Sequence, residues 1–599
     1  MLDHAQHEIL DTLETFNVAM AAGDGLAMAS CFEADGYWRD LLAFTWNITT
    51  MQGHDEITRM LASQLTLTAP LPLQIDPEEL VEDDGTSLSA WVRFETALVH
   101  GYGHIRVREG RIWTLLTTIA ELKGHPEMIG TRRPAGVSHG AHSDRRSWLE
   151  QREAEFGSVG IDEQPYVLIV GGGQGGIALG ARLRALGVPT VIAERNSRAG
   201  DSWRNRYKSL CLHDPVWYDH LPYLDFPDNW PVFAPKDKLG DWLESYTKIM
   251  ELNYWTDTIC KRCDYDDAAG RWTVEVERDG MPLTLHPAHV VLATGMSGKP
   301  RIPQFKGMER FTGDHHHSSQ HPGPDAYCGK KAVVIGSNNS SHDICAALWE
   351  TGVDVTMVQR STTHIVRSDS LMELGLGPLY SQQAVDDGIT TAKADMIFAS
   401  IPYGLLADFQ RPVYNQIAER DRVFYDQLAE AGFMLDWGAD DSGLFMKYLR
   451  RGSGYYIDVG ASELIIDGKI KLASGAEVSE ITETSVCLSD GTRLEADLIV
   501  YATGYTSMNS WAADLMGQEV ADKVGKCWGL GSDTPRDPGP WLGELRNMWK
   551  PTRQPGLWFH GGNLHQSRHY SLYLAMQLKA RMEGLEIKVY DIPETHHPA

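Results

Sequence analysis

The residues with the clearest chemistry are three glycines and one acid. Gly171, Gly173 and Gly176 follow an apolar run, Tyr166–Val170, and open a helix. In a dinucleotide site the first glycine permits a tight turn, the second lets a pyrophosphate approach the backbone, and the third lets the helix pack on its strand. Glu194 ends the next apolar strand and can accept hydrogen bonds from a ribose 2′-hydroxyl. The pattern predicts dinucleotide binding; a glycine-rich turn in an ordinary βαβ unit is the alternative.

A second glycine turn predicts a second nucleotide. The stretch AVVIGSNNSSHD has Gly336 at the first turn, while Asn338 and Ser341 replace the later glycines. The strand that follows ends at Gln359 and Arg360 instead of an acid. Because a cation at this place suits a 2′-phosphate, NADPH is favoured, and the neutral Gln359 keeps NADH as an alternative. The candidate contacts here are Gly336, Ser337, Asn338, Ser340, Gln359 and Arg360.

Length and charge narrow the choice of partners. A chain of 599 residues exceeds one hydrophobic core, and the formal net charge is −27. Nucleic acid and anionic membranes attract basic surfaces, so neither is expected as a partner. No apolar run reaches the length of a membrane span, and the first residues lack a signal-peptide pattern. A cytoplasmic enzyme with a small-molecule substrate is therefore expected.

The eight cysteines are scattered, which argues against a disulfide framework. Cys260 and Cys263 have CxxC spacing, but no second pair of ligands follows them and their flanks read as a strand. We favour a structural role for this pair over a metal or redox role.

The first 125 residues predict a separate α+β domain. Apolar residues fall at helical spacing at Ile9, Leu13, Phe16 and Met20, and later segments alternate like hairpin strands. This order resembles the cone-shaped SnoaL-like domains at the level of fold. In such domains an aspartate in the cavity can act as acid or base, and Asp40 is the candidate. The favoured alternative is a filled cavity that now serves interdomain packing or a homodimer.

The segment after Glu194 carries a family resemblance. GDSWRNRY followed by SLCLHDP resembles the flavin-containing monooxygenases, particularly their plant auxin-forming relatives. In that family this segment holds FAD, which implies contacts from Ser202 and Trp203 and places His213 near the reacting part of the flavin. ATG elements at Thr294 and at Thr503 are similar to those where the family's chain crosses between cofactor domains. The cofactor contacts that pattern and resemblance imply, beyond those of the second turn, are Gly171, Gly173, Gly175, Gly176, Glu194, Arg195, Ser202, Trp203, Arg204, His213, Thr294, Gly295, His317, Thr503, Gly504, Asn563 and Gln566.

The stretch FTGDHHHSSQHP resembles the signature shared with Baeyer–Villiger monooxygenases. Phe311, Gly313 and His317 fit it, whereas His321 stands where an aromatic residue is expected. Four histidines this close also suggest a metal site, but an oxygen-activating iron would need a carboxylate partner. We therefore predict no metal.

The resemblance spans roughly residues 165–585 and implies a reaction. FAD would be reduced by NADPH and react with O2, and a C4a-(hydro)peroxyflavin would oxygenate a small organic substrate. If the substrate is a ketone, the product would be an ester or lactone. In the other case, a sulfur or nitrogen atom of the substrate would be oxygenated. Three residues are candidates for catalysis. His213 and His321 are hypothesised to influence protonation of the peroxide, with a hydrogen-bonded core histidine as the equal alternative for His213. Arg568 is a candidate for holding a negative oxygen, although a structural salt bridge is its favoured role. A flavin-dependent NAD(P)H reductase or oxidase, and a FAD-binding sensor without turnover, remain alternatives.

The expected fold class is α/β, with two nested Rossmann-type domains for FAD and NADPH behind the small α+β domain. Helical patterns between the two ATG elements predict an insertion that covers the active site. The expected parts are 1–125, the SnoaL-like domain; 126–164, a linker with a short helix; 165–312, the first FAD-binding part; 313–490, the NAD(P)H-binding domain with its insertion at about 369–460; and 491–599, the return to the FAD-binding domain with the C-terminal tail.

Overall fold

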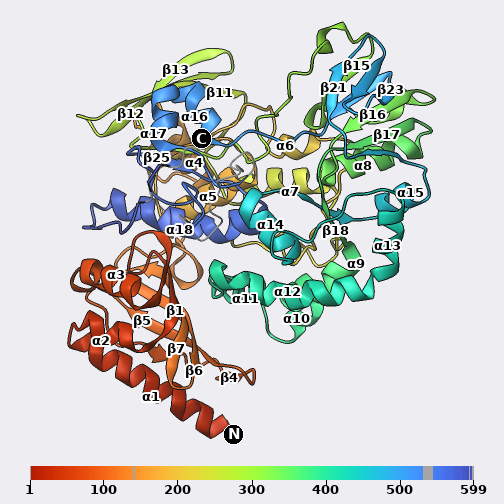
Figure 1. Cartoon of the computed structure of the whole chain (residues 1–599). Helices are drawn as coiled ribbons and strands as arrows, with labels where there is room; N and C mark the ends of the chain where they lie inside the picture. Colours follow the sequence, from red (N-terminus) through yellow and green to blue (C-terminus); the bar gives the residue numbers. More distant parts are fainter. Residues whose placement is uncertain (1, 138, 142, 530–543, 593, 596–599) are drawn as a thin grey trace.

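The computed structural model describes residues 2–137, 139–141, 143–529, 544–592 and 594–595. In it an N-terminal sheet with helices, two nucleotide-binding folds and a helical insertion are packed together (Figure 1). No helix in these described ranges is long and apolar enough to cross a membrane.

The N-terminal part is a curved sheet with helices on one face. The strand order is β2-β1-β7-β6-β5-β3, with β4 paired to β5. Trp38 packs against Phe16, Phe32 and Phe44 at ring-centroid distances of 5.8, 5.8 and 5.0 Å, which fills the space between helices and sheet. The elements are α1 (Leu2–Ala21), α2 (Gly25–Ser30), β1 (Phe32–Leu41), β2 (Ile48–Gln52), α3 (Gly53–Thr68), β3 (Gln74–Ile75), β4 (Glu82–Asp83), β5 (Leu88–Glu95), β6 (Val99–Arg108) and β7 (Arg111–Leu122).

A connecting segment joins this part to the first nucleotide fold. It contains η1 (Gly130–Arg132) and α4 (Trp148–Ser158). Ser147 and Glu150 form a capping box at the start of α4, which explains why the helix begins there.

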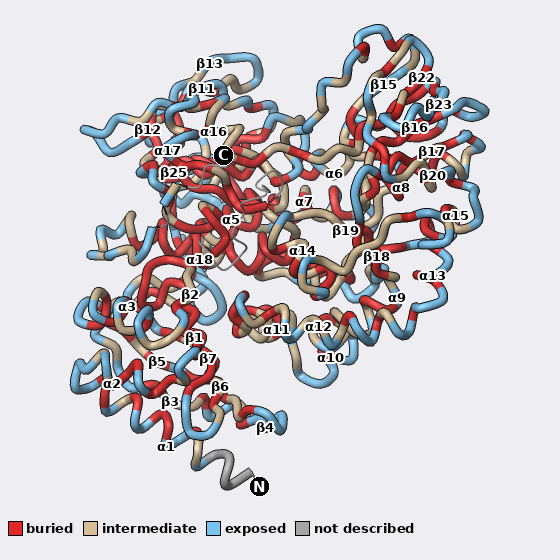
Figure 2. The backbone as a smooth tube through the Cα atoms, in the orientation of Figure 1, coloured by how far each residue is buried: buried red, intermediate tan, exposed pale blue. Residues whose placement is uncertain are grey.

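The first nucleotide fold is a parallel sheet in the order β10-β9-β8-β14-β25. Helix α5 packs on β8 and β9, and Figure 2 shows the strands of this sheet and α18 as buried. Such a sheet needs continuous apolar strands, as β8 has. The elements are β8 (Val167–Val170), α5 (Gln174–Ala185), β9 (Thr190–Ala193), α6 (Asp201–Arg204), α7 (Lys236–Ile249), β10 (Tyr254–Trp255), β14 (His289–Leu292), β25 (Leu557–Phe559) and α18 (Leu564–Met582). An antiparallel sheet of β11 (Thr258–Asp266), β12 (Arg271–Arg278) and β13 (Met281–Leu285) lies beside it.

The second nucleotide fold is a parallel sheet in the order β15-β24-β16-β17-β20. Strand β24 lies between β15 and β16, so the chain leaves this sheet after Tyr501 and not at the expected residue 490. The end of this domain is set by the pairing of β24 with β15 and β16, which the sequence pattern does not reveal. The elements are η2 (Met308–Arg310), β15 (Asp314–His317), η3 (Ser318–Gln320), η4 (Asp325–Tyr327), β16 (Lys331–Ile335), α8 (Asn339–Glu350), β17 (Asp354–Gln359), α15 (Ala461–Ile466), β20 (Lys471–Ser474), β21 (Val478–Ile481), β22 (Ser485–Leu488), β23 (Arg493–Glu495) and β24 (Leu498–Tyr501).

A helical insertion leaves the second fold between two short strands that pair in parallel, β18 (His364–Arg367) and β19 (Tyr455–Asp458). In Figure 1 its helices run below the two nucleotide folds and reach the N-terminal part. The helices are α9 (Ser368–Ser370), η5 (Leu371–Leu376), α10 (Gln382–Asp386), α11 (Thr391–Ala399), α12 (Tyr403–Arg420), α13 (Arg422–Glu430) and α14 (Gly443–Arg451). Two further helices, α16 (Asn509–Met516) and α17 (Gln518–Val524), lie on the return to the first fold.

Candidate active site

A cavity of about 1260 Å³ lies where the two nucleotide folds meet. Both glycine turns, both ATG elements, the start of α18 and part of the insertion line it. The predicted contacts found in its lining are Gly171, Gly173, Gly175, Glu194, Arg195, Ser202, Trp203, Thr294, Gly295, Gly336, Ser337, Asn338, Ser340, Arg360, Thr503, Gly504 and Asn563. Residues far apart in sequence therefore share one space.

Each glycine of the first turn has its own steric reason. A Cβ on Gly171, whose φ is +108°, would lie 2.5 Å from the carbonyl oxygen of Ala293. A Cβ on Gly176 would lie 2.1 Å from the carbonyl oxygen of Gly171, so this glycine serves helix packing and lies outside the cavity lining. At Gly173 the nearest protein atom to an added Cβ is 3.6 Å away, so the space beside its backbone is open.

The first turn fits a pyrophosphate. Gly173 is the N-cap residue of α5 and provides no side-chain cap, so the first N–H groups of the helix are free to donate to an anion. The hydroxyl of Thr294 is buried at the cavity and has no partner among the described residues. Glu194 is buried and accepts from the N–H of Gly172 (2.7 Å) and of Asn196 (2.8 Å), which holds its carboxylate at the wall.

The second turn has the same arrangement. Gly336 has φ +131°, and a Cβ there would lie 2.4 Å from the carbonyl oxygen of Ala502. Asn338 is the N-cap residue of α8 but its side chain makes no capping hydrogen bond, which leaves the first N–H groups of the helix for a second phosphate. Arg360 is exposed and lines the cavity.

Gln359 has a different place from the one expected. It is fully buried; its amide donates to the carbonyl of Met434 (2.9 Å) and accepts from the Met434 N–H (2.8 Å). Both halves of the amide are used within the protein. The structure therefore corrects the expectation that Gln359 contacts a nucleotide, and among the two residues ending this strand it leaves Arg360 in the lining.

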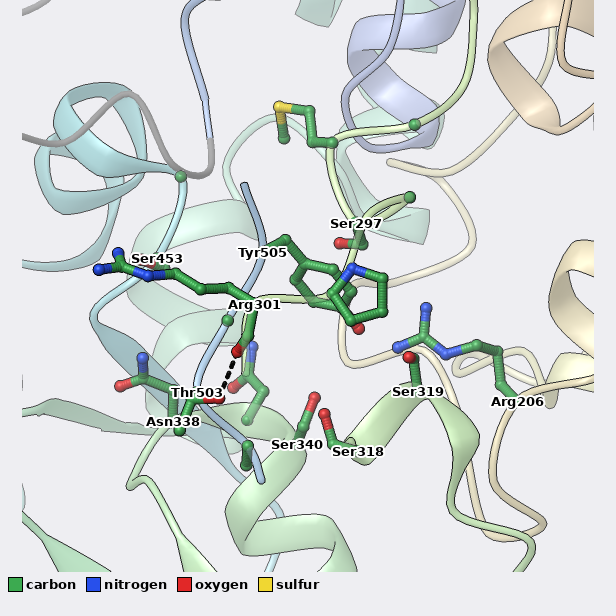
Figure 3. A pocket seen from close by; sticks show the side chains of 18 of the residues that line it. Arg206, Ser297, Arg301, Ser318, Ser319, Asn338, Ser340, Ser453, Thr503 and Tyr505 are labelled. Atoms are coloured by element: carbon green, nitrogen blue, oxygen red, sulfur yellow. Dashed lines mark hydrogen bonds between the residues drawn. The ribbon is translucent and has the colours of Figure 1, made fainter. Parts of the chain in front are cut away.

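The walls carry basic side chains although the chain is acidic overall. Figure 3 shows Arg206 and Arg301 entering from different segments around Tyr505, with Ser318, Ser319 and Ser340 nearby. Thr503 donates to the Arg301 carbonyl at 2.5 Å and ties the second ATG element to the segment after the first. Cations here suit phosphates. Sequence reasoning missed both arginines, although Arg206 lies in the quoted motif GDSWRNRY.

The insertion supplies a further wall that sequence reasoning did not assign to residues. Lys447, Tyr448, Arg451 and Tyr455 line the cavity. Tyr448 donates to the side-chain oxygen of Gln566 at 2.5 Å, which joins α14 to the start of α18. No sequence motif marks these positions.

Arg568, a predicted catalytic residue, lies outside the lining. Its guanidinium donates to both oxygens of Asp395 at 2.8 Å and to the carbonyls of Tyr218 (2.8 Å) and His220 (2.7 Å). Burial opposes its charge, but the negative charge of Asp395 outweighs this and raises the pKa of Arg568. The structure places it in the salt bridge that was its favoured role, between α18 and the insertion.

His213 also lies outside the lining. Its Nε2 is 3.4 Å from Asp343 on α8, so it bridges the two nucleotide folds. Burial alone would lower its pKa, but the hydrogen bond and charge of Asp343 overcome this and raise it. His213 therefore contacts Asp343 across the two folds, and its role near the flavin stays a prediction.

The histidines of the signature segment are structural in this arrangement. His317 is buried and bonds the Ser319 hydroxyl and the Gly504 carbonyl, both at 2.9 Å, so it fixes the second ATG element. His321 is buried, its Nδ1 lies 2.9 Å from the Nε2 of His316, and it is absent from the lining. Burial, aided by His316, lowers the pKa of His321 to about 4. His321 therefore does not border the cavity, and its role in protonation stays a prediction.

Two remaining predicted contacts, Arg204 and Gln566, lie behind residues that line the cavity and are not part of the lining. Arg204 forms ion pairs with Asp201 (3.0 Å), Asp241 (2.8 Å) and Glu244 (3.1 Å). Gln566 accepts from Tyr448 and caps the helix that Asn563 begins. Both support residues that do line the cavity.

In the N-terminal part, Asp40 is fully buried. It accepts hydrogen bonds from the hydroxyls of Thr117 (2.5 Å) and Thr45 (2.6 Å) and from the N–H groups of Phe44 and Thr45. Burial raises its pKa to about 6, against these hydrogen bonds. The carboxylate closes a turn and does not border the cavity between the nucleotide folds.

Comparison with known proteins places the chain in a family. The family model described as pyridine nucleotide-disulphide oxidoreductase matches residues 168–401. The chain is 30% identical over 371 residues to indole-3-pyruvate monooxygenase YUCCA1 of Oryza sativa subsp. japonica, covering 60% of this chain and 82% of the relative. It is 28% identical over 356 residues to the probable indole-3-pyruvate monooxygenase YUCCA3 of Arabidopsis thaliana, covering 58% and 75%. Cyclohexanone monooxygenase from Rhodococcus sp. Phi1 bound to NADP+ aligns with a TM-score of 0.49 at 16% identity, covering 70% and 84%.

The match to the rice relative, at 30% identity and over most of that protein, shows the family. The two nucleotide folds with uncapped helix starts fit its two cofactors. The chain belongs to the class B flavin monooxygenases, which use FAD and NADPH to oxygenate a small substrate with O2.

Proposed function

We propose that this enzyme oxygenates a small carbonyl compound, and that 2-oxo acids are the first class to test. The single observation that carries the proposal is the shared cavity, in which both nucleotide turns meet a wall from the insertion. The relatives' names support a carbonyl substrate, since indole-3-pyruvate is a 2-oxo acid. Basic side chains on the walls, such as Arg206 and Arg301, suit a carboxylate as well as phosphates.

Bound FAD, reduced by NADPH, supplies the oxygen-activating chemistry. The residues of the protein bind and orient the cofactors and enclose the space for the substrate. The N–H groups at the starts of α5 and α8 hold phosphates, and Glu194 faces a ribose. Arg360 supplies the cation for a 2′-phosphate. Tyr448 and Tyr455 of the insertion border the space for the substrate and exclude water from it.

The experiment measures NADPH consumption, O2 uptake and H2O2 release by the purified flavoprotein. Indole-3-pyruvate, cyclohexanone and methyl phenyl sulfide are each added, and products are identified by mass spectrometry. We expect the 2-oxo acid to accelerate NADPH consumption and to yield a product carrying 18O from 18O2. Turnover with the sulfide alone would contradict the carbonyl proposal while leaving the family assignment intact.

The same assay separates the alternatives. A reductase or oxidase would convert NADPH and O2 to H2O2 in equal amounts with every compound. A FAD-binding sensor would not bleach its flavin on addition of NADPH. Free H2O2 converts 2-oxo acids to carboxylic acids without an enzyme, so a parallel reaction contains catalase. An oxygenated product that still forms with catalase present excludes both alternatives.

We also propose that the enzyme acts in the cytoplasm and forms a homodimer through its N-terminal helices. Leu10 and Val18 on α1, Leu26 on α2 and Leu67 on α3 are exposed apolar residues, and burying them against a second copy would be favourable. Light scattering during size-exclusion chromatography measures the molar mass and so tests the homodimer. A monomer at micromolar concentration would refute it.

A further inference from the structure

We propose that Arg39 of the N-terminal part is a positioning residue for the oxygenation reaction. It joins the helical insertion to α18, and both of these segments line the cavity. We infer that the N-terminal part holds the helical insertion in place, and with it the side of the cavity that the insertion forms. We call this support the brace. The inference rests on the family's reaction and not on the proposed substrate.

The Arg39 guanidinium contacts three segments at once. Its Nε and Nη2 donate to one oxygen of Glu544 at 2.9 and 2.5 Å, and its Nη1 donates to the carbonyl of Ala399 at 2.5 Å. Its Cζ lies 4.5 Å from the ring centre of Tyr403. Ala399 ends α11, where unpaired carbonyls and the helix dipole favour a cation. Arg39 is 1% exposed, so these interactions are not screened by solvent.

The same contact continues into α18. The hydroxyl of Tyr403 lies 2.9 Å from that of Tyr570, which also lies 3.4 Å from Nη2 of Arg39. Two residues earlier in α18, Arg568 holds Asp395 of α11 by two hydrogen bonds. Helix α11 is thus tied to α18 through its middle residue, Asp395, and to the N-terminal part through its last residue, Ala399.

From α18 and the insertion the path reaches the cavity. Asn563, at the start of α18, lines it, and Gln566 in the first turn accepts from Tyr448 of α14. Tyr448 itself lines the cavity. A shift of α11 and α12 relative to α18 therefore changes the wall that faces the substrate and the reacting end of the cofactors.

Further contacts between the N-terminal part and the insertion lie beside the Arg39 contacts. Arg106 donates to the carbonyl (2.9 Å) and hydroxyl (2.8 Å) of Ser400, and Lys393 pairs with Glu79 at 2.7 Å. These contacts come from other strands and loops of the N-terminal part. They make the brace a broad interface with Arg39 at its buried centre.

The test uses the full-length holoenzyme with Arg39→Lys and Tyr403→Phe. Lysine keeps the charge but not the planar fork that spans three segments. Phenylalanine removes only the hydroxyl contact to Tyr570. Arg59→Lys on α3 is the matched control, because Arg59 is exposed and away from this interface. FAD content, the fraction of NADPH diverted to H2O2, and deuterium exchange of residues 391–420 are measured for each.

We expect Arg39→Lys to raise the peroxide fraction about fivefold, which is less than the full effect of one lost charged hydrogen bond, while FAD content stays at the wild-type level. Tyr403→Phe should give a smaller rise, and both variants should exchange faster in residues 391–420. Arg59→Lys should match wild type. If Arg39→Lys yields no holoenzyme, Tyr403→Phe decides the matter. Wild-type coupling and exchange in the variants that fold would overturn the proposal, as would faster exchange with unchanged coupling.

Discussion

Replacing Gly173 by alanine separates the needs of the fold from those of the cofactor. Gly173 has φ −75° and ψ −170°, a conformation open to any residue. The nearest protein atom to an added Cβ is the Ser202 hydroxyl oxygen at 3.6 Å, which is an ordinary contact. We therefore expect the apoprotein to keep its stability to within about 0.5 kcal/mol.

The cofactor meets a different situation, because the added methyl group stands where a pyrophosphate must approach the backbone. Crowding a well-packed site by one carbon costs about 1–3 kcal/mol. At about 1.4 kcal/mol for each tenfold change, the dissociation constant for FAD should rise about 5- to 150-fold.

The assay titrates apoprotein with FAD and follows flavin fluorescence, with the apparent melting temperature of the apoprotein measured in parallel. Gly157→Ala is the matched control, since an alanine there meets no atom within 4 Å and Gly157 lies on α4, outside the cavity lining. FAD affinity that is unchanged in Gly173→Ala would refute the assignment of this turn to the pyrophosphate. A melting temperature several degrees lower would refute the steric argument instead.

Three further predictions follow from the same geometry. Arg360→Ala should weaken NADPH binding about tenfold and leave NADH binding unchanged; equal losses for both in binding titrations would contradict a 2′-phosphate contact. The bridge from His213 to Asp343 should be pH-dependent, because the pKa of His213 is raised in the folded protein. Its contribution is then fully present below the unfolded value of about 6.5 and is lost as pH rises through the raised pKa; His213→Asn should remove this part of the pH dependence of the melting temperature, and an unchanged profile would contradict it. Arg568→Leu should cost about 3–5 kcal/mol because it leaves the buried carboxylate of Asp395 without its partner. Adding Asp395→Leu should restore most of that loss in denaturant unfolding; a double variant no more stable than the single one would argue against the pair.

Nearby residues were enough to identify the cofactors. A strand, a glycine turn, a helix and a terminal acid lie within about thirty residues, and backbone geometry forces them to act together. Gly171, Gly173 and Glu194 therefore lie at one wall of the cavity, as the sequence pattern predicts. The second turn at Gly336 follows the same logic.

Roles that depend on a distant partner were not predictable in this way. A structural salt bridge was the favoured role for Arg568, but the sequence did not identify its partner, Asp395, which lies 173 residues earlier in the chain. Gln359 was expected to contact the nicotinamide nucleotide, but its side-chain amide is hydrogen-bonded to the backbone of Met434. A side chain's partner is decided by which segments pack beside it, and the sequence spacing carries no record of that packing.

The contacts of the insertion and of the N-terminal part depend most strongly on partners that are distant in the sequence. Arg39 and Glu544 are 505 positions apart and become one buried ion pair only when the sheet of the N-terminal part meets the return segment. Local sequence determines which cofactors this enzyme uses, because the turns that bind them are continuous in the chain. The tertiary structure decides what surrounds the substrate, because that wall is assembled from segments that meet only in the folded protein.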